Sequence, residues 1–279
     1  MKLSIIIVAF NNGIELKECL NSIIQNNDLN QEIEIIVVDN SAYLNDKVYG
    51  VCSLFPSIKY VPNTNDGFGK GNNVGYQHCK GDYILFLNPD TLILKPCFIK
   101  MIRSYEKIQN CGTLGFKLIG KNGKENNSYN IRFNYGILNK FLLFLCRRVG
   151  LFFRKKMYTC GADIFIKKTI FEDVGMFDEN IFMYSEETDL SYRIEQIGKK
   201  VSYSKSLKIV HLQGQSSGSN AIKSLSMMLE SDFYCAKKHN KNFKKMMAKE
   251  IRAMKLLNFL KMKKYNQETI NLYKKYLIL

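Results

Sequence analysis

The sequence predicts an α/β fold in which helices flank a mainly parallel central sheet. Short apolar runs rich in β-branched residues, which are typical of strands buried on both faces, alternate with segments of helical periodicity. Polar residues follow three of the predicted strands, where an open parallel sheet binds its ligands. Strands that alternate with helices imply right-handed crossovers and a sheet covered on both sides.

The elements are clearest in the first half of the chain. Strands are predicted over residues 3–10, 33–40, 58–61 and 83–87, with helices at 45–55 and 70–80 and, from the spacing of Leu16, Leu20, Ile23 and Ile24, between the first two strands. Further along we expect a helix over 95–109, strands over 113–119, 163–167, 201–203 and 207–210, a helix over 189–197 that ends at Gly198, and helices from residue 221 onward. Residues 121–124 carry a turn signal, and residues 135–158 are basic, aromatic and without a clear pattern. The pattern predicts one domain over residues 1–218 and a helical, basic C-terminal extension over 219–279.

The charge is strongly positive, with 41 Lys and Arg against 25 Asp and Glu and a formal net charge of +16. Residues 237–279 carry 13 basic residues and two acids, and residues 126–162 carry seven basic residues and no acid. Such patches suit nucleic acid, anionic lipid or a phosphate-bearing substrate, although a solvated basic face without a partner would look the same.

The eight cysteines form no C-x-x-C pair, which argues against a zinc site and favours a reducing compartment. The apolar run at the N-terminus is too short for a signal peptide. No stretch approaches the roughly 18 to 20 apolar residues of a membrane span. We therefore expect a cytoplasmic protein that contacts a membrane surface.

Polar residues at three strand ends predict a partly anionic pocket at one edge of the sheet. The three sets are Asn11 and Asn12, Asp39 and Asn40, and Asn88 and Asp90. A carboxylate at Asp90, after the rigid Pro89, could bind Mg²⁺ or Mn²⁺ together with phosphate oxygens. Turn formation by Asn and Asp is the alternative explanation at each strand end.

The segment at residues 65–75, NDGFGKGNNVG, is rich in glycine and follows a strand, as in a phosphate-binding loop. It matches neither the dinucleotide-binding pattern nor the P-loop pattern, so a flexible connector that begins a helix is the alternative.

Glu186, Glu187 and Asp189 cluster at the start of a predicted helix, where the helix dipole favours acids. In a cleft, neighbouring carboxylates would instead repel, which raises the pKa of one of them and suits a general base. Asp189 and Arg193 are spaced as a structural ion pair. His211 ends a strand-like run and is either a structural residue or part of the site.

Taken in order, these stretches resemble glycosyltransferase family 2, a family of inverting enzymes with the GT-A fold, a Rossmann-like α/β architecture. The resemblance covers roughly residues 3–218 and depends on four collinear segments: SIIIVAFNN with IIVVDNS, NTNDGFGKGNNVGY leading to YILFLNPDT, CGADIFIKK with VGMFDENIFMYSEETDLSYRI, and IVHLQGQSSG. The combination is most similar to the rhamnosyltransferase-like subgroup of cell-surface polysaccharide and O-antigen assembly. It implies a nucleotide-sugar half over about residues 1–95 and an acceptor half over 96–218.

The resemblance also implies a role for individual residues. The nucleotide-sugar donor would contact Ala9, Phe10, Asn11, Asp39, Gly67, Lys70, Asn72 and Asn88, with Asp39 accepting a hydrogen bond from the pyrimidine base. Asp90 and His211 would hold Mg²⁺ or Mn²⁺; Asn88 departs from the family's acidic first position, which leaves the metal one carboxylate fewer. Glu187 would be the base, with Glu186 as the reserve candidate.

The expected reaction is transfer of a sugar, from dTDP-rhamnose or a UDP-sugar, to a hydroxyl of a glycan or lipid-linked acceptor. Residues 135–158 would form an acceptor or membrane-surface element, with burial of their apolar side chains in the core as the alternative, and the Lys-rich tail suits the anionic inner face of a cell membrane. A sugar nucleotidyltransferase and a basic nucleic-acid-binding protein are the alternatives. The chain lacks the glycine-rich loop that a nucleotidyltransferase carries after its first strand. It also lacks a helix-turn-helix or RNA-binding signature, so we expect no nucleic-acid partner.

Overall fold

The computed structural model describes residues 1–212, 221–263 and 265–278. In this part of the chain, an eight-stranded sheet has the order β3-β2-β1-β4-β9-β6-β10-β5, and β7 and β8 pair separately. The strands are β1 (Leu3–Ala9), β2 (Ile33–Asp39), β3 (Ile58–Pro62), β4 (Tyr83–Leu87), β5 (Thr91–Ile93), β6 (Cys111–Ile119), β7 (Tyr129–Ile131), β8 (Met157–Thr159), β9 (Asp163–Lys167) and β10 (Lys200–His211).

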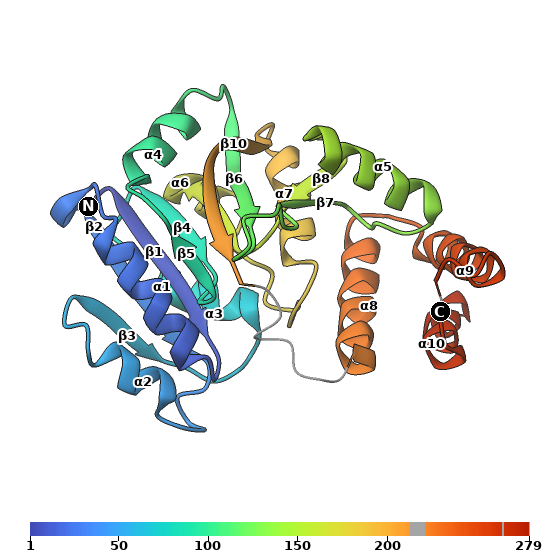
Figure 1. Ribbon diagram of the computed structural model, residues 1–279, viewed down its shortest axis with the longest axis horizontal. Coiled ribbons are helices and arrows are strands. Elements are labelled where there is room, and N and C mark those ends of the chain that lie inside the picture. The colour runs from blue at the N-terminus through green and yellow to red at the C-terminus, as the bar shows by residue number, and fades with distance from the viewer. Residues whose placement is uncertain (213–220, 264, 279) are drawn as a thin grey trace.

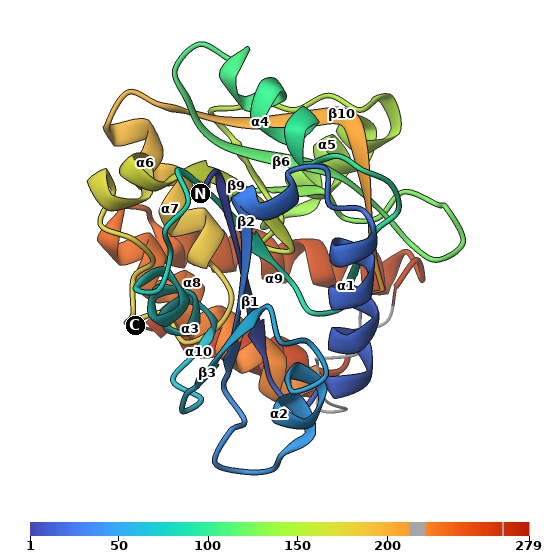
Figure 2. The same cartoon turned by 90° about the vertical axis from the view of Figure 1, so that its left-hand side faces the viewer.

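Helices cover both faces of this sheet, and Figure 2 shows β1 between α1 on one side and α3 on the other. The helices are α1 (Gly13–Gln25), α2 (Lys47–Cys52), α3 (Phe68–Tyr76), α4 (Phe98–Glu106), α5 (Ile137–Val149), α6 (Lys168–Asp173), α7 (Glu186–Gln196), α8 (Ala221–Lys238), α9 (Phe243–Phe259) and α10 (Gln267–Ile278). All seven residues of β1 and all five of β4 are buried. The predicted sheet with helices on both faces is confirmed.

The strand directions bring several chain segments to one edge of the sheet. β1 is parallel to β2 and β4, and β2 is parallel to β3. β9 is antiparallel to both β4 and β6, β6 is parallel to β10, and β5 is antiparallel to β10. The carboxyl ends of β1, β2, β3, β4, β6 and β10 therefore share an edge with the starts of β5 and β9, and residues just outside these strands can meet in one site.

Some elements differ from the prediction. The two short strands expected at 201–203 and 207–210 form the single strand β10, whose pairing with β6 shifts register between Ser204 and Lys208. The patternless segment 135–158 contains α5 and the start of β8, and α7 begins at Glu186 rather than at 189. The short strand β5 is recognisable only through its pairing with β10, because three residues carry too little periodicity.

The helices α8, α9 and α10 lie at the end of the molecule opposite β1, β2 and β3 (Figure 1). They form their own apolar cluster, in which Phe133 and Tyr135 from the segment before α5 are also buried. The expected helical extension is therefore present, while its proposed boundary near Gly218 lies outside the described residues. Among the described helices, none combines the length and apolar character that crossing a membrane requires.

Candidate active site

A cavity of about 1500 Å³ opens at the edge where the strands end. It is large enough for more than one substrate, because ligand sites commonly measure about 300–1,000 Å³. Its walls come mainly from four regions: the strand ends of the sheet, the segment from β7 to α5, residues 180–188 at the start of α7, and α8 with parts of α9 and α10. Of the residues predicted for the site, the cavity is lined by Phe10, Asn88, Asp90, Glu186, Glu187 and His211.

Asp90 and His211 face one another at the sheet edge. His211, the last residue of β10, pairs with Thr91 of β5, so the carboxylate that precedes β5 is placed beside the imidazole. His211 Nε2 lies 3.3 Å from Asp90 Oδ1, and both side chains are more than nine-tenths buried. Asp90 Oδ1 and His211 Nδ1 have no hydrogen-bond partner among the described residues.

This donor set fits a divalent cation. A buried carboxylate oxygen without a hydrogen bond is costly unless a positive charge offsets it. One carboxylate and one imidazole are ligands that Mn²⁺ accepts, and Mg²⁺ typically takes one or two carboxylates together with substrate phosphates. Asn88 lines the same part of the cavity, and its backbone N–H donates to the Ala162 carbonyl at 3.1 Å.

The other residues predicted to contact the donor do not line the cavity. Asp39 is fully buried; its carboxylate accepts hydrogen bonds from the Ser41 backbone and hydroxyl (2.8 and 2.7 Å) and from the Tyr60 hydroxyl (2.9 Å). These bonds fix the end of β2, and the neighbouring residue Asn40 lines the cavity instead. A contact between Asp39 and a base stays a prediction.

The glycine-rich segment has a structural function at the start of α3. Gly67 has a φ of 110° and lies so close to Phe182 that a Cβ would approach its carbonyl oxygen to 2.4 Å. The Asn72 amide donates to the Phe68 carbonyl at 3.0 Å, and Lys70 pairs with Asp66 at 3.3 Å. The lining of the cavity does not include Gly67, Lys70, Asn72, Ala9 or Asn11. The contacts of these five residues with a donor remain predictions.

Glu186 and Glu187 begin α7 and both line the cavity. Burial raises the pKa of Glu186 well above its usual range, and the neighbouring charge of Glu187 raises it further. Burial also raises the pKa of Glu187, against hydrogen bonding from backbone N–H groups that include Gly161, which lowers it. Glu186 Oε1 is buried without a hydrogen-bond partner among the described residues. Burial is therefore the main cause of both shifts, and the repulsion between carboxylates that the sequence suggested adds to it at Glu186.

Glu187 and Asp90 lie near the same thiol, that of Cys160. Burial raises the pKa of Cys160 to about 12, and the carboxylates of Glu187, Asp163 and Asp90 each add to the rise. Cys160 and Gly161 come just before β9, at the shared edge of the sheet. The candidate metal ligand Asp90 and the candidate base Glu187 therefore belong to one site, where the strand ends meet the start of α7.

The C-terminal extension supplies an acid to this site that the sequence analysis missed. Asp232 of α8 lines the cavity and accepts hydrogen bonds from the hydroxyl groups of Ser185 and Tyr135. Ser185 and the preceding Tyr184 have φ angles of 66° and 71°, each of which costs on the order of 1–3 kcal/mol outside glycine. Asp232 therefore holds the strained entry to α7, and its charge contributes to the raised pKa of Glu186.

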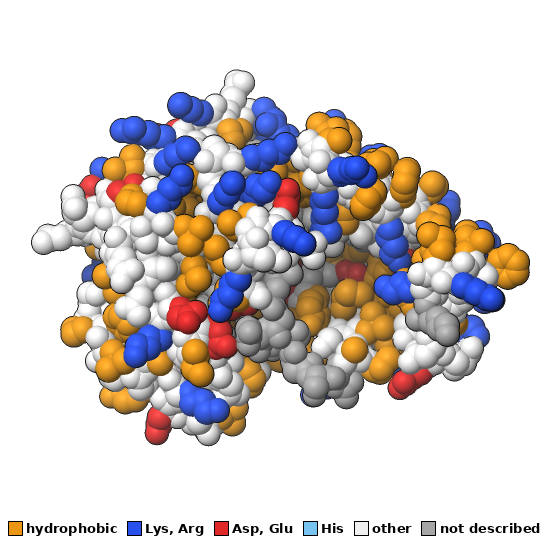
Figure 3. Space-filling model, viewed as in Figure 1, with side chains coloured by type: hydrophobic (Ala, Val, Ile, Leu, Met, Phe, Trp, Pro, Cys, Tyr) orange, Lys and Arg blue, Asp and Glu red, His pale blue; other side chains and the backbone are white. Residues whose placement is uncertain are grey.

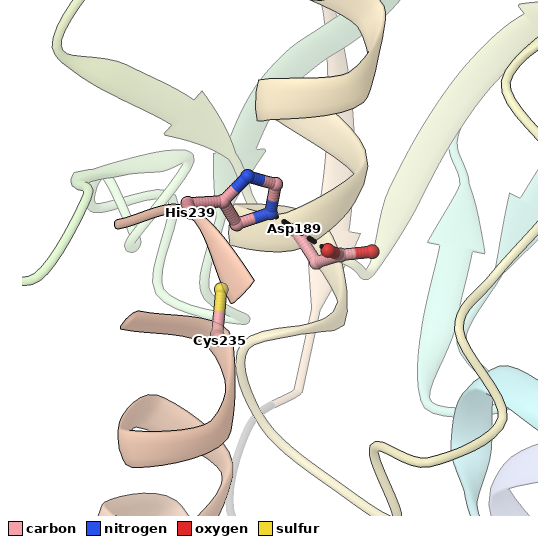
Figure 4. A group of neighbouring side chains, drawn as sticks. All are labelled: Asp189, Cys235 and His239. Atoms are coloured by element: carbon pink, nitrogen blue, oxygen red, sulfur yellow. Dashed lines mark hydrogen bonds and ion pairs between the residues drawn. The ribbon is translucent and has the colours of Figure 1, made fainter. Parts of the chain in front are cut away.

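A second group of potential metal ligands, Asp189, Cys235 and His239, lies on α7 and at the end of α8 (Figure 4). Its carboxylate is already neutralised, however. Asp189 contacts Arg193 through Oδ2 at 2.7 Å, and Lys238 and His239 through Oδ1 at 2.8 Å each. Burial raises the pKa of the Cys235 thiol, which disfavours the thiolate that a metal needs.

This group is therefore an ion-pair cluster that joins α8 to α7. It includes the predicted pair of Asp189 with Arg193, which is confirmed. The His239 ring stacks on Tyr192 of α7 with 4.4 Å between ring centroids, which strengthens the same junction.

A family model described as "Glycosyl transferase family 2" matches residues 4–175. The chain belongs to this family. It is also similar to rhamnosyltransferase WbbL of Escherichia coli (strain K12), at 26% identity over 259 residues that cover 86% of this chain and 96% of that protein. These matches confirm the predicted family and its rhamnosyltransferase-like character.

Solved structures share the fold. The chain superposes on GalNAc-T7, solved with UDP, GalNAc and Mn²⁺, with a TM-score of 0.61 and 17% identity over 85% of this chain and 48% of that one. It superposes on the mannosyltransferase PcManGT of Pyrobaculum calidifontis, solved with GDP-Man and Mn²⁺, with a TM-score of 0.58 and 11% identity over 99% and 69% of the two chains. These likenesses confirm the GT-A fold.

Proposed function

We propose that this family 2 glycosyltransferase moves a sugar from a nucleotide-diphosphate donor to a hydroxyl of a glycan or lipid-linked acceptor, with inversion at the anomeric carbon. The similarity to the rhamnosyltransferase WbbL makes a rhamnose donor the first to test. The family resemblance adds dTDP as its nucleotide, UDP-sugars as the next donors, and cell-surface polysaccharide such as O-antigen as the product. The main support is the convergence of Asp90 and His211 with Glu186 and Glu187 in one cavity.

In this proposal Asp90 and His211 would hold Mg²⁺ or Mn²⁺. When bound, such an ion offsets the negative charge that develops on the departing phosphate oxygen. Asn88 and Phe10 line the donor side of the cavity. The strand ends thereby position the donor with its anomeric carbon toward α7.

Glu187 takes the proton from the acceptor hydroxyl, which approaches the anomeric carbon from the face opposite the leaving group. Its raised pKa suits a general base, since proton transfer is most effective when the pKa lies near the working pH. Glu186 is the reserve candidate, and its more strongly raised pKa keeps it protonated over a wider pH range. Asp232 positions both glutamates through Ser185.

The proposed location is the cytoplasm, at the inner face of the cell membrane, where a lipid-linked acceptor would be found. The family assignment favours this transferase over a sugar nucleotidyltransferase or a nucleic-acid-binding protein.

The test is a donor screen with the purified chain, in which release of nucleoside diphosphate is measured with a candidate acceptor, with Mn²⁺ or Mg²⁺ and with a chelator. We expect release with one donor that stops when the metal is removed. Release that continues unchanged in chelator would contradict the metal assignment, and synthesis of nucleotide sugar from a nucleoside triphosphate would contradict the proposed reaction.

A further inference from the structure

The outer face of α5 is apolar although it is exposed. Leu143 and Cys146 pack inward with Tyr129 and Met157. The opposite side presents large apolar side chains with exposed fractions of 80% (Leu138), 59% (Phe141), 56% (Phe144), 42% (Leu145) and 62% (Val149). Their spacing of three and four residues places them along one side of the helix. A stripe of this kind on a folded protein marks a contact surface.

The end of α9 presents a second group of exposed apolar residues: Phe259 at 83%, Leu260 at 50% and Met262 at 72%. Glu250 connects the two helices, because it accepts a hydrogen bond from the Gly136 backbone at 2.7 Å and pairs with Lys140. Figure 3 shows apolar side chains over α5 and over the α9 region, with Lys and Arg beside them.

Exposed cations accompany both groups. Arg148 follows the stripe on α5, and Arg154, Lys155 and Lys156 come just after it. On α9 the exposed cations are Lys244, Lys245, Lys249, Arg252 and Lys255. Residues 126–162 contain no acid that could neutralise the first group. A surface that is apolar in its centre and cationic around it matches the headgroup region of an anionic bilayer.

We propose that the exposed faces of α5 and the end of α9, here called the docking face, bind an anionic lipid bilayer. This inference names the part of the protein that would contact the membrane, and it rests on the membrane location proposed above. A second copy of this chain is a poorer occupant, because it would bring two uncompensated cationic groups together. Lys140 and Arg147 of α5 also line the cavity, so docking through α5 would place the cavity wall beside a lipid-linked acceptor.

The experiment is cosedimentation of the full chain with vesicles of phosphatidylcholine alone or mixed with phosphatidylglycerol, at several salt concentrations. The double variant Leu138→Ser/Phe141→Ser removes apolar side chains that are 80% and 59% exposed. Its matched control, Ile14→Ser/Leu54→Ser, changes residues that are 79% and 59% exposed on α1 and just after α2. All four side chains are exposed, so both variants should keep the fold.

We expect the chain to bind the anionic vesicles more tightly than the neutral ones, with affinity that falls as salt rises. The α5 double variant should bind at least about tenfold more weakly, since apolar burial and charge act together in such surfaces. The control should bind like the unchanged chain. Replacing Arg154, Lys155 and Lys156 by Gln should remove the preference for phosphatidylglycerol.

Three results would overturn the proposal: no binding to anionic vesicles, equal loss in the two double variants, or a dimer in light scattering that the α5 variant abolishes. Release of nucleoside diphosphate by these variants with water-soluble substrates is measured alongside. Loss of vesicle binding with intact release separates the docking face from the transfer reaction. If the unchanged chain releases nucleoside diphosphate but does not bind vesicles, the docking face is rejected and the proposed transfer reaction is not.

Discussion

Replacing Gly161 by Ala should disable the candidate base without unfolding the protein. A Cβ at this position would lie 2.1 Å from Glu187 Oε1 and 3.0 Å from its Cδ. Because real Cβ contacts are essentially never shorter than 3.0 Å, the carboxylate oxygen must move by about 0.9 Å. A misplacement of about 1 Å can cost roughly 10²-fold in rate. That loss corresponds to about 2.7 kcal/mol of transition-state stabilisation.

The assay is turnover of the donor identified by screening, together with the affinity for nucleoside diphosphate and the melting temperature. Turnover should fall about a hundredfold, while nucleotide affinity and melting temperature stay close to those of the unchanged protein. Gly161 does not have a positive φ, so Ala fits its backbone. Gly50→Ala in α2 is the matched control, since nothing lies within 4 Å of its added Cβ. Full activity of Gly161→Ala would refute the assignment of Glu187 in its observed position.

Three further predictions concern acids of the site and of the ion-pair cluster. Glu187→Gln should lower turnover by about 10²–10⁴ with nucleotide binding retained, and an active variant would transfer the role to Glu186, which the same assay on Glu186→Gln tests. Because burial raises the pKa of Glu187, activity should fall with decreasing pH already above the ordinary glutamate pKa of about 4.3; the charge of Asp232 contributes to the raised pKa of Glu186 instead, so a fall that moves to lower pH in Asp232→Asn would transfer the role of base to Glu186. Asp189→Asn leaves Arg193 without its buried counter-charge and removes the carboxylate of α7 that Lys238 and His239 contact, so it should lower the free energy of unfolding in denaturant titration by about 3–5 kcal/mol; a change below 1 kcal/mol would show that the cluster does not join α7 to α8.

Local sequence patterns were sufficient to predict the buried strands of the sheet and to single out Asp90 and His211. The runs at β1 and β4 are continuous and apolar because both strands are buried on both faces, which is the strongest signal that a strand can carry. Asp90 and His211 could be predicted as residues that end strands, although their 3.3 Å approach depends on the pairing of β5 with β10, which only the fold reveals.

The contribution of the C-terminal extension could not be predicted from motifs. Asp232 lies seven residues after Leu225 and three after Leu229, which places a carboxylate on the apolar side of α8. That position predicts a buried acid. It does not predict the hydrogen-bond partners of Asp232, because Ser185 and Tyr135 are 47 and 97 residues away in sequence. Local patterns also did not distinguish Asp39, whose hydrogen bonds to Ser41 and Tyr60 hold the end of β2, from a ligand-binding carboxylate.

Binding of Mn²⁺, measured by electron paramagnetic resonance in the presence of UDP or dTDP, tests the central claim most directly. Asp90→Asn should abolish nucleotide-dependent Mn²⁺ binding, because it removes the carboxylate that lies 3.3 Å from His211. Cys235→Ser, in the cluster with Asp189 and His239, should leave it unchanged. Undiminished Mn²⁺ binding by Asp90→Asn, or its loss in Cys235→Ser, would contradict the placement of the ion at the ends of the strands.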